Sequence, residues 1–309
     1  MTSTSPHTEI FKGLDLETGV RLDRFTSFRV GGPADFLSRP GTVDELTAVL
    51  KATRDADIPV TVLGGGSNTL ISDRGIRGMV IVLTRLKTGP ERLRQEPDGP
   101  DGVTCVSAMA GERLSALCRF AVDNGLAGLE WAAGIPGTLG GAIMMNAGAH
   151  GSDMAAVIET VDILDLPSLA CKTLAVADLD FRYRGLNQEN GIVLKAELAL
   201  THGDPDTLRN AFDRNLEGKR TTQPLSKASG GCFFKNPSPE TPAGRLIEET
   251  GLKGYRFNGA MVSDLHANFI INHDNASCKD ILAVKRVVQD RVYQKFGIKL
   301  ESEVKAIGD

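Results

Sequence analysis

The sequence lacks a long uninterrupted hydrophobic run. No stretch approaches the roughly 20 apolar residues that a membrane-spanning helix requires. The opening residues Met1–Glu9 are polar and carry no hydrophobic core of the kind found in secretory signals. We therefore expect a cytoplasmic protein without a membrane partner.

Cysteine and histidine are few, and neither forms a ligand pair. The five cysteines are widely spaced, odd in number and without a C-x-x-C pair, which fits a reducing compartment and argues against a disulfide framework. The five histidines form neither an H-x-x-x-H nor an H-E-x-x-H pair. A zinc site or other metal site is therefore not expected.

Positive charge is not in excess either. The 35 Lys and Arg residues stand against 39 Asp and Glu, which gives a net charge of −4. Because nucleic-acid-binding proteins normally show a basic excess, we expect no nucleic-acid partner. The hydrophobic content of 41% and the charged content of 24% are typical of a globular protein. At 309 residues the chain is long enough for two or three domains.

Short strands alternate with fewer helices, which favours an α+β fold over a regular βαβ repeat. Thr42 and Glu45 form a capping-box pair, and Thr241 followed by Pro242 is typical of a helix start. Capping signals and apolar stripes predict helices over 42–58, 111–124, 204–219, 241–250 and 277–297. Runs rich in β-branched residues predict strands at 35–38, 59–63, 78–83, 103–108, 157–164, 171–176, 192–200, 267–272 and 298–307. Residues 86–101 are polar and rich in Pro and Gly, which predicts a loop.

Two glycine-rich segments are candidates for binding a phosphorylated cofactor. Gly64–Asn68 follows a strand, and its free backbone N–H groups would suit a pyrophosphate. It is neither a Walker A loop nor a G-x-G-x-x-G fingerprint, and a simple tight turn is the alternative. The second segment runs over 134–151, and two such loops can hold an extended dinucleotide from both ends. A pair of close backbone crossings that need small residues is the alternative here.

The segment Ala228–Pro237 combines two glycines, Cys232, two aromatics and a Lys-Asn pair. A thiol with an ordinary pKa of roughly 8.5 is mostly protonated at neutral pH. Cys232 is therefore a candidate proton donor or nucleophile, and a buried structural cysteine is the alternative. A nearby cation such as Lys235 would favour the thiolate, which cannot donate a proton.

Eight motifs occur together in one order and spacing over roughly residues 22–308. They are V-L-G-G-G-S-N at 62–68, G-I-P-G-T-L-G-G at 134–141, N-A-G-A at 146–149, F-R-Y-R at 181–184, G-G-C-F-F-K-N-P at 230–237, L-K-G-Y at 252–255, H-A-N-F-I-I-N at 266–272 and E-S-E-V at 301–304. With these motifs the chain resembles the UDP-N-acetylenolpyruvoylglucosamine reductases. These are bacterial flavoenzymes of peptidoglycan precursor synthesis within the vanillyl-alcohol-oxidase-like FAD superfamily.

The resemblance implies an α+β fold with a two-lobed FAD-binding module and a C-terminal α/β substrate domain. The expected parts are an N-terminal FAD-binding subdomain (1–88), a second FAD-binding subdomain (89–202) and a substrate-binding domain (203–309). The run between Arg184 and Arg220 is too short for the tyrosine-bearing insertion of some relatives, so the chain resembles the shorter subtype. A monomer is expected.

The resemblance also implies the reaction, that of a UDP-N-acetylmuramate dehydrogenase. NADPH reduces FAD, and the enolpyruvyl ether of the UDP-sugar then takes a hydride at C3 and a proton at C2. Cys232 stands where better-known members carry the serine that donates this proton. Arg184 matches the arginine that polarises the substrate carboxylate, and Glu303 matches a glutamate at the same end of the substrate. This activity implies roles in cell wall biogenesis, cell shape, the cell cycle and cell division.

Further residues are assigned through the same resemblance. Arg220, Lys235 and Asn236 are expected to bind the diphosphate of the UDP-sugar, which needs cations and N–H donors. His266 is expected to anchor a turn into its strand. The residues expected to bind FAD are Gly64, Gly65, Gly66, Ser67, Asn68, Gly134, Ile135, Pro136, Gly137, Thr138, Gly140, Gly141, Asn146 and Gly148.

Two other functions stay open at this point. One is a different FAD-dependent sugar or lactone oxidoreductase of the same superfamily, against which the C-terminal motifs argue. The other is a non-enzymatic nucleotide-sugar-binding protein, against which the presence of Arg184 and Glu303 argues.

Overall fold

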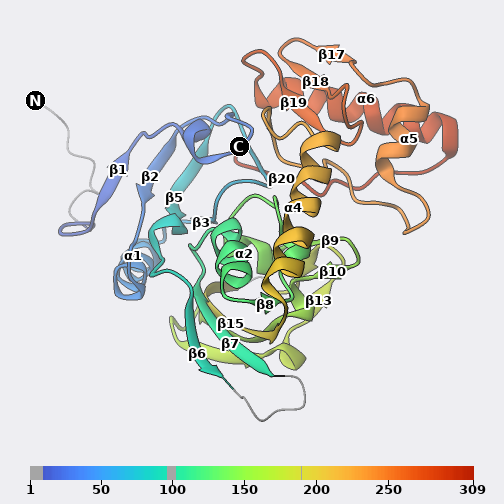
Figure 1. Cartoon of the computed structure of the whole chain (residues 1–309). Helices are drawn as coiled ribbons and strands as arrows, with labels where there is room; N and C mark the ends of the chain where they lie inside the picture. The colour runs from blue at the N-terminus through green and yellow to red at the C-terminus, as the bar shows by residue number, and fades with distance from the viewer. Residues whose placement is uncertain (1–9, 96–101, 189) are drawn as a thin grey trace, which may run out of the picture. The chain divides into compact units, whose positions relative to one another are not determined.

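The computed structural model describes residues 10–95, 102–188 and 190–309. They form two compact units, each built from separated segments of the chain (Figure 1). Unit 1 contains Met1–Thr18, Phe36–Gly65 and Gly78–Glu217, and unit 2 contains Gly19–Asp35, Gly66–Arg77 and Gly218–Asp309. The division into three consecutive domains at 1–88, 89–202 and 203–309 stays a prediction.

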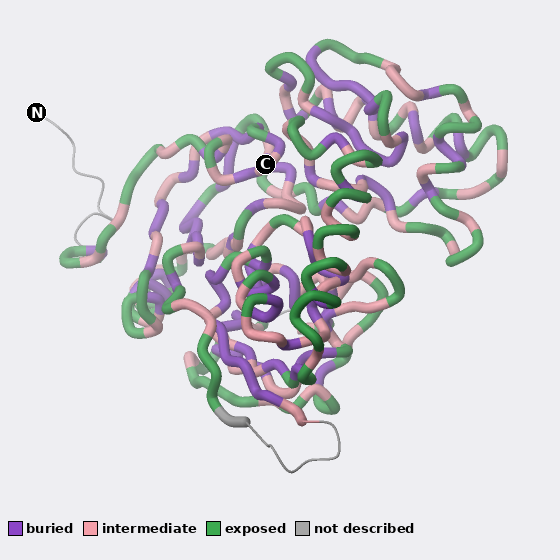
Figure 2. Tube along the Cα trace, viewed as in Figure 1, coloured by how far each residue is buried: buried purple, intermediate pink, exposed green. Residues whose placement is uncertain are grey.

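Unit 1 contains an antiparallel six-stranded sheet in the order β12-β11-β15-β7-β6, with β8 also paired to β15. One face of this sheet packs on α2 (Leu114–Asp123) and α3 (Leu139–Met144), and together they form the main core of the unit. Figure 2 shows that β7 and α2 are largely buried, whereas β12 is mostly exposed. The strands are β6 (Glu91–Gln95), β7 (Val103–Met109), β8 (Leu126–Ala127), β11 (Ile158–Asp165), β12 (Cys171–Ala175) and β15 (Gly191–His202).

A second sheet has the order β1-β2-β5-β3, in which β3 and β5 run parallel. Its strands are β1 (Leu16–Thr18), β2 (Ala34–Ser38), β3 (Val60–Leu63) and β5 (Ile76–Val82). Leu46, Val49 and Leu50 of helix α1 (Val43–Asp55) are buried beside Met79 and Ile81 in the second core of unit 1. Short paired strands complete the unit: β9 (Gly148–Ala149) with β10 (Ser152–Asp153), and β13 (Phe181–Arg182) with β14 (Gly185–Leu186).

Unit 2 contains a small antiparallel sheet in the order β16-β19-β18-β17. The strands are β16 (Ala228–Ser229), β17 (Arg256–Phe257), β18 (Ala260–Val262) and β19 (Ile270–Asn272). Helices α5 (Ala243–Glu249) and α6 (Cys278–Phe296) contribute to its core, which also contains Phe28, Phe233 and Phe234. A parallel pair, β4 (Thr69–Ile71) with β20 (Lys305–Ile307), belongs to the same unit. Helix α4 (Pro205–Thr222) contains the last boundary between the units, at Gly218.

The predicted helices are all present, and local signals explain their ends. Thr42 accepts a hydrogen bond from the Glu45 N–H, and Glu45 in turn accepts from the Gly41 N–H rather than from Thr42 itself. Ser277 and Asp280 form a complete capping box on α6. The helix ends at Gly297, whose φ of 70° is a left-handed value that glycine adopts easily.

Four expectations were wrong in detail. The predicted loop over 86–101 contains strand β6, which is formed by pairing with β7 rather than by an apolar pattern of its own; residues 96–101 lie outside the described part. The N-cap residue of α5 is Pro242 and not Thr241. The N–H of Ala243, the first residue of the helix, donates to the side chain of Asn236. The strand predicted over 267–272 is reduced to β19, because the side chain of Asn268 bonds to Phe234. The strand predicted over 298–307 is reduced to β20, and Ser302 before it forms only an isolated bridge, to Phe234.

Within the described residues, no helix combines the length and the apolar content that crossing a bilayer would require.

Candidate functional site

In unit 1 the first glycine loop packs closely on the second. A Cβ atom at Gly64 would lie 2.5 Å from Thr138 Oγ1, and one at Gly65 would lie 3.0 Å from Gly137 Cα. The contact at Gly64 is closer than real Cβ atoms make, and the one at Gly65 is unusually tight, so glycine fits both positions best. The close crossing expected as the alternative reading is therefore present, and it forms a narrow cradle of small residues.

The second loop is fixed from behind by backbone hydrogen bonds. Gly137 has φ of 112° and its carbonyl accepts from the Leu114 N–H at 3.1 Å. The Gly140 N–H donates to Ala110 O at 2.9 Å, and a Cβ at Gly140 would lie 2.8 Å from Ala110 Cβ. These contacts explain two more of its glycines. Of the other residues expected to bind FAD here, Gly134 has φ of 73°, Ile135 packs on the core, Pro136 is exposed and Gly141 is half-buried.

Thr138 carries a buried hydroxyl that has no hydrogen-bond partner in the protein. The residue is 3% exposed and occupies the N-cap position of α3, yet its side chain makes no capping bond. A buried polar atom without a partner is costly, so such atoms in a native fold point to a missing ligand or water. Next to Gly64 and Gly65, this hydroxyl fits a polar atom of a bound dinucleotide, which is consistent with FAD.

Arg184 is held in one orientation within unit 1. Its Nη1 donates to Gly148 O at 2.8 Å, and its guanidinium carbon lies 5.5 Å from the centre of the Tyr183 ring. The residue has φ of 59°, a left-handed value that is uncommon outside glycine. Gly148, predicted from the sequence as a cofactor residue, thus also positions the predicted catalytic arginine.

Asn146 supports strand β13, which precedes Arg184. Its Nδ2 donates to Asp153 Oδ2 at 3.1 Å and to Arg182 O at 3.2 Å, while its Oδ1 accepts from the Ala155 N–H at 3.1 Å. The side chain is 5% exposed and its amide makes three bonds within the protein. Asn146 therefore stabilises the turn that leads to Arg184.

In unit 2 the rest of the first glycine loop is tied to Ser27. The Ser27 N–H donates to Gly66 O at 3.1 Å, and its hydroxyl donates to Ser67 O at 3.2 Å and to Ser229 O at 2.5 Å. Gly66 has φ of 62°, and a Cβ there would collide with the Phe25 carbonyl oxygen. Ser27 thus joins Gly66 and Ser67 to the start of the cysteine segment, a link that is invisible in the local sequence.

The cysteine segment makes a tight turn before Cys232. A Cβ at Gly230 would collide with the ring of Phe28, and Gly231 has φ of 78°. Glycine is therefore favoured at 230 by the close approach of the Phe28 ring and at 231 by the left-handed backbone conformation. The Cys232 side chain is half-buried and packs against the apolar cluster of Met261, Phe269 and Ile271.

The backbone of Phe233 joins Cys232 to two distant segments. Its N–H donates to Asn268 O at 2.7 Å, and its carbonyl accepts from the Glu303 N–H at 2.9 Å. Asn68 Nδ2 donates to Glu303 O at 3.1 Å, so the end of the first glycine loop is also bonded to Glu303. The structure therefore brings Cys232, Glu303 and Asn68 together within unit 2.

The predicted substrate-binding residues differ in their surroundings. The Lys235 ammonium lies 3.6 Å from a Glu301 carboxylate oxygen. The Oδ1 atom of Asn236 accepts from the Ala243 N–H at 3.0 Å and so caps α5. This bond does not involve the Nδ2 atom of Asn236. Arg220 is exposed in the last turn of α4.

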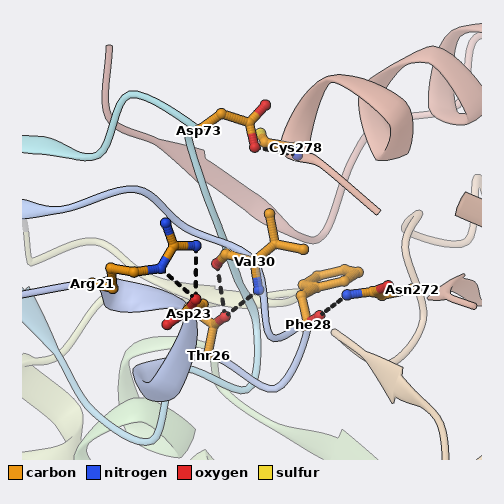
Figure 3. A network of polar contacts seen from close by, with 8 residues as sticks. All are labelled: Arg21, Asp23, Thr26, Phe28, Val30, Asp73, Asn272 and Cys278. Atoms are coloured by element: carbon orange, nitrogen blue, oxygen red, sulfur yellow. Dashed lines mark hydrogen bonds and ion pairs between the residues drawn. The ribbon is translucent and has the colours of Figure 1, made fainter. Parts of the chain in front are cut away.

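His266 and Cys278, both in unit 2, have shifted pKa values. Burial lowers the pKa of His266, whose Nδ1 accepts from the Asn268 N–H at 3.2 Å and whose ring packs edge-on against Phe269. His266 thus anchors the turn before β19, as expected. Burial, with a smaller effect of Asp73, raises the pKa of Cys278 to about 11. Asp73 accepts hydrogen bonds from the first N–H groups of α6 (Figure 3).

Unit 1 also contains one group of potential metal ligands among the described residues. Ligand atoms of Cys105, Glu159 and Glu197 lie within 4.8 Å of one another. The Cys105 thiol donates to Glu197 Oε2 at 3.7 Å, and Lys195 Nζ lies 3.8 Å from Glu197 Oε1. The expectation that there is no metal site stays a prediction.

Sequence reasoning missed Ser27 and Asn268 as parts of the site. Asn268 lies inside the motif H-A-N-F-I-I-N at 266–272, whereas Ser27 lies in none of the eight motifs. Their role depends on partners that are 202 and 34 residues away along the chain. For Asn268 the available signal was a polar residue flanked by two apolar residues.

Comparison with known proteins adds family matches to this geometry. The model of a FAD-binding domain matches residues 34–168. The model of the C-terminal domain of UDP-N-acetylenolpyruvoylglucosamine reductase matches residues 223–307. The two matches together include both loops and the cysteine segment.

Relatives with the same name match nearly the whole chain. A UDP-N-acetylenolpyruvoylglucosamine reductase from Synechococcus sp. (strain CC9605) is 43% identical over 293 residues, which covers 94% of this chain and 95% of the relative. One from Clostridioides difficile (strain 630) is 41% identical over 297 residues, which covers 96% and 94%. The crystal structure of UDP-N-acetylenolpyruvylglucosamine reductase from Thermus caldophilus matches with a TM-score of 0.78 and 34% identity, covering 95% of this chain and 99% of that one.

Proposed function

The chain belongs to the UDP-N-acetylenolpyruvoylglucosamine reductase family, and on that premise we propose that Cys232, Arg184 and Glu303 carry out the proton-transfer half of its reaction. The activity is reduction of the enolpyruvyl ether of UDP-N-acetylenolpyruvoylglucosamine, with FAD as cofactor and NADPH as reductant. The fold expected from the sequence, an α+β protein with a FAD-binding module and a C-terminal domain, is confirmed.

The two glycine loops hold FAD in this proposal. Support comes from Gly64 and Gly65, where a Cβ atom would lie 2.5 Å and 3.0 Å from the second loop, and from the buried Thr138 hydroxyl beside them, which has no protein partner. Bound FAD would supply the redox chemistry of the reaction, the transfer of a hydride from NADPH to C3 of the enolpyruvyl group. The protein contributes close backbone approach and one preorganised hydroxyl. The full proposed set is Gly64, Gly65, Gly66, Ser67, Asn68, Gly134, Ile135, Pro136, Gly137, Thr138, Gly140, Gly141, Asn146 and Gly148.

Cys232 donates the proton to C2 of the substrate. The observation that carries this role is the bonding of Phe233, the next residue, to both Asn268 and Glu303, which fixes the thiol-bearing backbone in the family's C-terminal domain. The Lys235 ammonium, which would favour a thiolate, lies 3.6 Å from a Glu301 carboxylate oxygen. A general acid needs the protonated thiol, which is the ordinary form of a cysteine at neutral pH.

Arg184 binds the substrate carboxylate, into which negative charge spreads as the hydride arrives at C3. Its guanidinium is already oriented by Gly148 O, so little reorganisation is needed when this charge develops. Glu303 orients the same end of the substrate, and its backbone is fixed by Phe233 and Asn68.

Arg220, Lys235 and Asn236 bind the substrate diphosphate. Two cations and an amide donor are the groups that a diphosphate requires, and the Nδ2 atom of Asn236 is available for this because Oδ1 caps α5. We also propose that the chain works as a cytoplasmic monomer, and that its product supports cell wall biogenesis and thereby cell shape, the cell cycle and cell division.

Spectroscopy of the purified protein tests the proposed function. Flavin absorbance should be bleached by NADPH and restored by UDP-N-acetylenolpyruvoylglucosamine under anaerobic conditions, with UDP-N-acetylmuramate as product. If NADPH bleaches the flavin but this substrate does not restore it, another FAD-dependent sugar or lactone oxidoreductase would replace the proposal. A protein that binds no flavin would contradict both.

A further inference from the structure

Asn268 makes three hydrogen bonds to the two residues that follow Cys232. Its Oδ1 accepts from the Phe234 N–H at 3.0 Å, and its Nδ2 donates to Phe234 O at 2.8 Å. Its own carbonyl accepts from the Phe233 N–H at 2.7 Å. Asn268 is 3% exposed, and both phenylalanines are fully buried, so water cannot replace these bonds.

These bonds take the place of a regular strand pair. Phe233 and Phe234 lie outside the named strands, and Phe234 makes only an isolated bridge, to Ser302. On that opposite side, Phe233 O accepts from the Glu303 N–H, and the Lys235 N–H donates to Glu301 O, both at 2.9 Å. The segment after Cys232 is therefore held between Asn268 on one side and residues 301–303 on the other.

Asn268 is itself fixed by the turn that precedes β19. Its N–H donates to His266 Nδ1 at 3.2 Å, and the Ser263 hydroxyl accepts from the His266 N–H at 3.4 Å. The turn is closed by hydrogen bonds between the backbones of Ser263, His266 and Phe269. A side chain on such a rigid support can set the position of a neighbouring backbone.

We infer that Asn268 is a positioning residue for proton transfer, because its amide sets where Cys232 stands relative to Glu303. This inference rests on the proposed role of Cys232 as proton donor. A displacement of about 1 Å at a reacting group can reduce a rate by about 100-fold. The loss should appear in the step that uses the proton and not in the reduction of FAD by NADPH.

Asn268→Asp is the sharpest variant. It preserves the size of the side chain and the oxygen that accepts from the Phe234 N–H. It also replaces the Nδ2 donor with a carboxylate oxygen, which then faces the carbonyl oxygen of Phe234. Reduction by NADPH should stay within about twofold of wild type, while reoxidation at saturating substrate should slow by roughly 10- to 100-fold. A variant that was only destabilised would lose folded protein, but its folded fraction would show both half-reactions at normal rates.

Asn272→Asp is the matched control. Asn272 lies in β19 of the same unit and also bonds to backbone through both amide atoms, to Phe28 O at 2.9 Å and from the Ala276 N–H at 2.8 Å (Figure 3). It makes no hydrogen bond to Phe233 or Phe234. Both half-reactions of this control should stay within about twofold of wild type.

Cys232→Ala separates failure of this inference from failure of the proposed function. If Cys232→Ala reoxidises normally, the proposed role of Cys232 as proton donor is wrong, while the reductase activity itself still stands. If it is slow while Asn268→Asp reoxidises at the wild-type rate, the positioning role is wrong. The double variant should be about as slow as Cys232→Ala alone, since the amide acts through the thiol. A double variant whose loss equals the product of the two separate losses would contradict the inference.

If Asn268→Asp does not fold, Asn268→Ser must show the same difference between the two half-reactions. Reoxidation of Asn268→Ser at the wild-type rate would refute the positioning role.

Discussion

Thr138→Val should change the stability of the apoprotein and its affinity for FAD in opposite directions. Valine has nearly the shape of threonine, and the hydroxyl it removes is buried without a protein partner. An unsatisfied buried hydroxyl costs roughly 1–3 kcal/mol. No capping bond is lost, because the side chain makes none. The free energy of unfolding of the apoprotein should therefore rise by about 1 kcal/mol.

The affinity for FAD should fall in the same variant. A hydrogen bond to a charged group contributes about 1.5–3 kcal/mol, and each 1.4 kcal/mol corresponds to about tenfold in the dissociation constant. If the hydroxyl binds a phosphate of FAD, the loss is about 10- to 100-fold. Urea unfolding of the flavin-free protein and a fluorescence titration with FAD measure the two effects separately.

Thr26→Val provides the control for the sign of the stability change. Thr26 is 6% exposed, and its hydroxyl both donates to Val30 O at 3.0 Å and accepts from the Val30 N–H at 3.4 Å (Figure 3). Its replacement leaves buried groups without a partner and should destabilise the protein by about 1–3 kcal/mol. If Thr138→Val destabilised the apoprotein as much as Thr26→Val and bound FAD normally, the assignment of Thr138 to the cofactor would be refuted.

Two further predictions concern Gly64 and His266. Gly64→Ala places a methyl group 2.5 Å from Thr138 Oγ1 and should weaken FAD binding by roughly 5- to 150-fold, an overpacking effect of about 1–3 kcal/mol. Its control is Gly218→Ala, in open space within α4, which should instead stabilise the protein by about 0.5–1 kcal/mol. Equal FAD affinities of the two variants would contradict the prediction. Burial lowers the pKa of His266 in the folded state, so the unfolded chain binds more protons than the folded one below about pH 6.5. The free energy of unfolding should therefore be highest above that pH and fall as the pH drops towards the folded pKa. Urea midpoints across this range should fall less steeply for His266→Gln, and identical slopes would be evidence against the assignment.

Much of the fold follows from local signals in the sequence. The ends of α6 were predictable because Ser277 and Gly297 act through their own neighbours. Strand β6 was missed because its alternation is polar and its formation depends on pairing with β7. The region before β20 was misassigned because Phe233 and Phe234 hold it through long-range bonds instead of a ladder.

The site was predictable as a set of motifs but not as a geometry. The sequence indicated Cys232, Arg184 and Glu303 through their resemblance to family positions, and their roles stay proposals. It could not indicate that Asn68 reaches Glu303 across 235 residues, or that Ser27 reaches Ser229 across 202. Such contacts depend on how separated segments pack, which no local pattern contains.

The most direct test of Cys232 as the proton donor compares Cys232→Ser with Cys232→Ala in single turnover. All three proteins should be reduced by NADPH at rates within about twofold of one another. Reoxidation by UDP-N-acetylenolpyruvoylglucosamine should remain appreciable in the serine variant, which retains a donor, and fall by about 100- to 10,000-fold in the alanine variant. An alanine variant that reoxidises at the wild-type rate would show that the proton comes from another group.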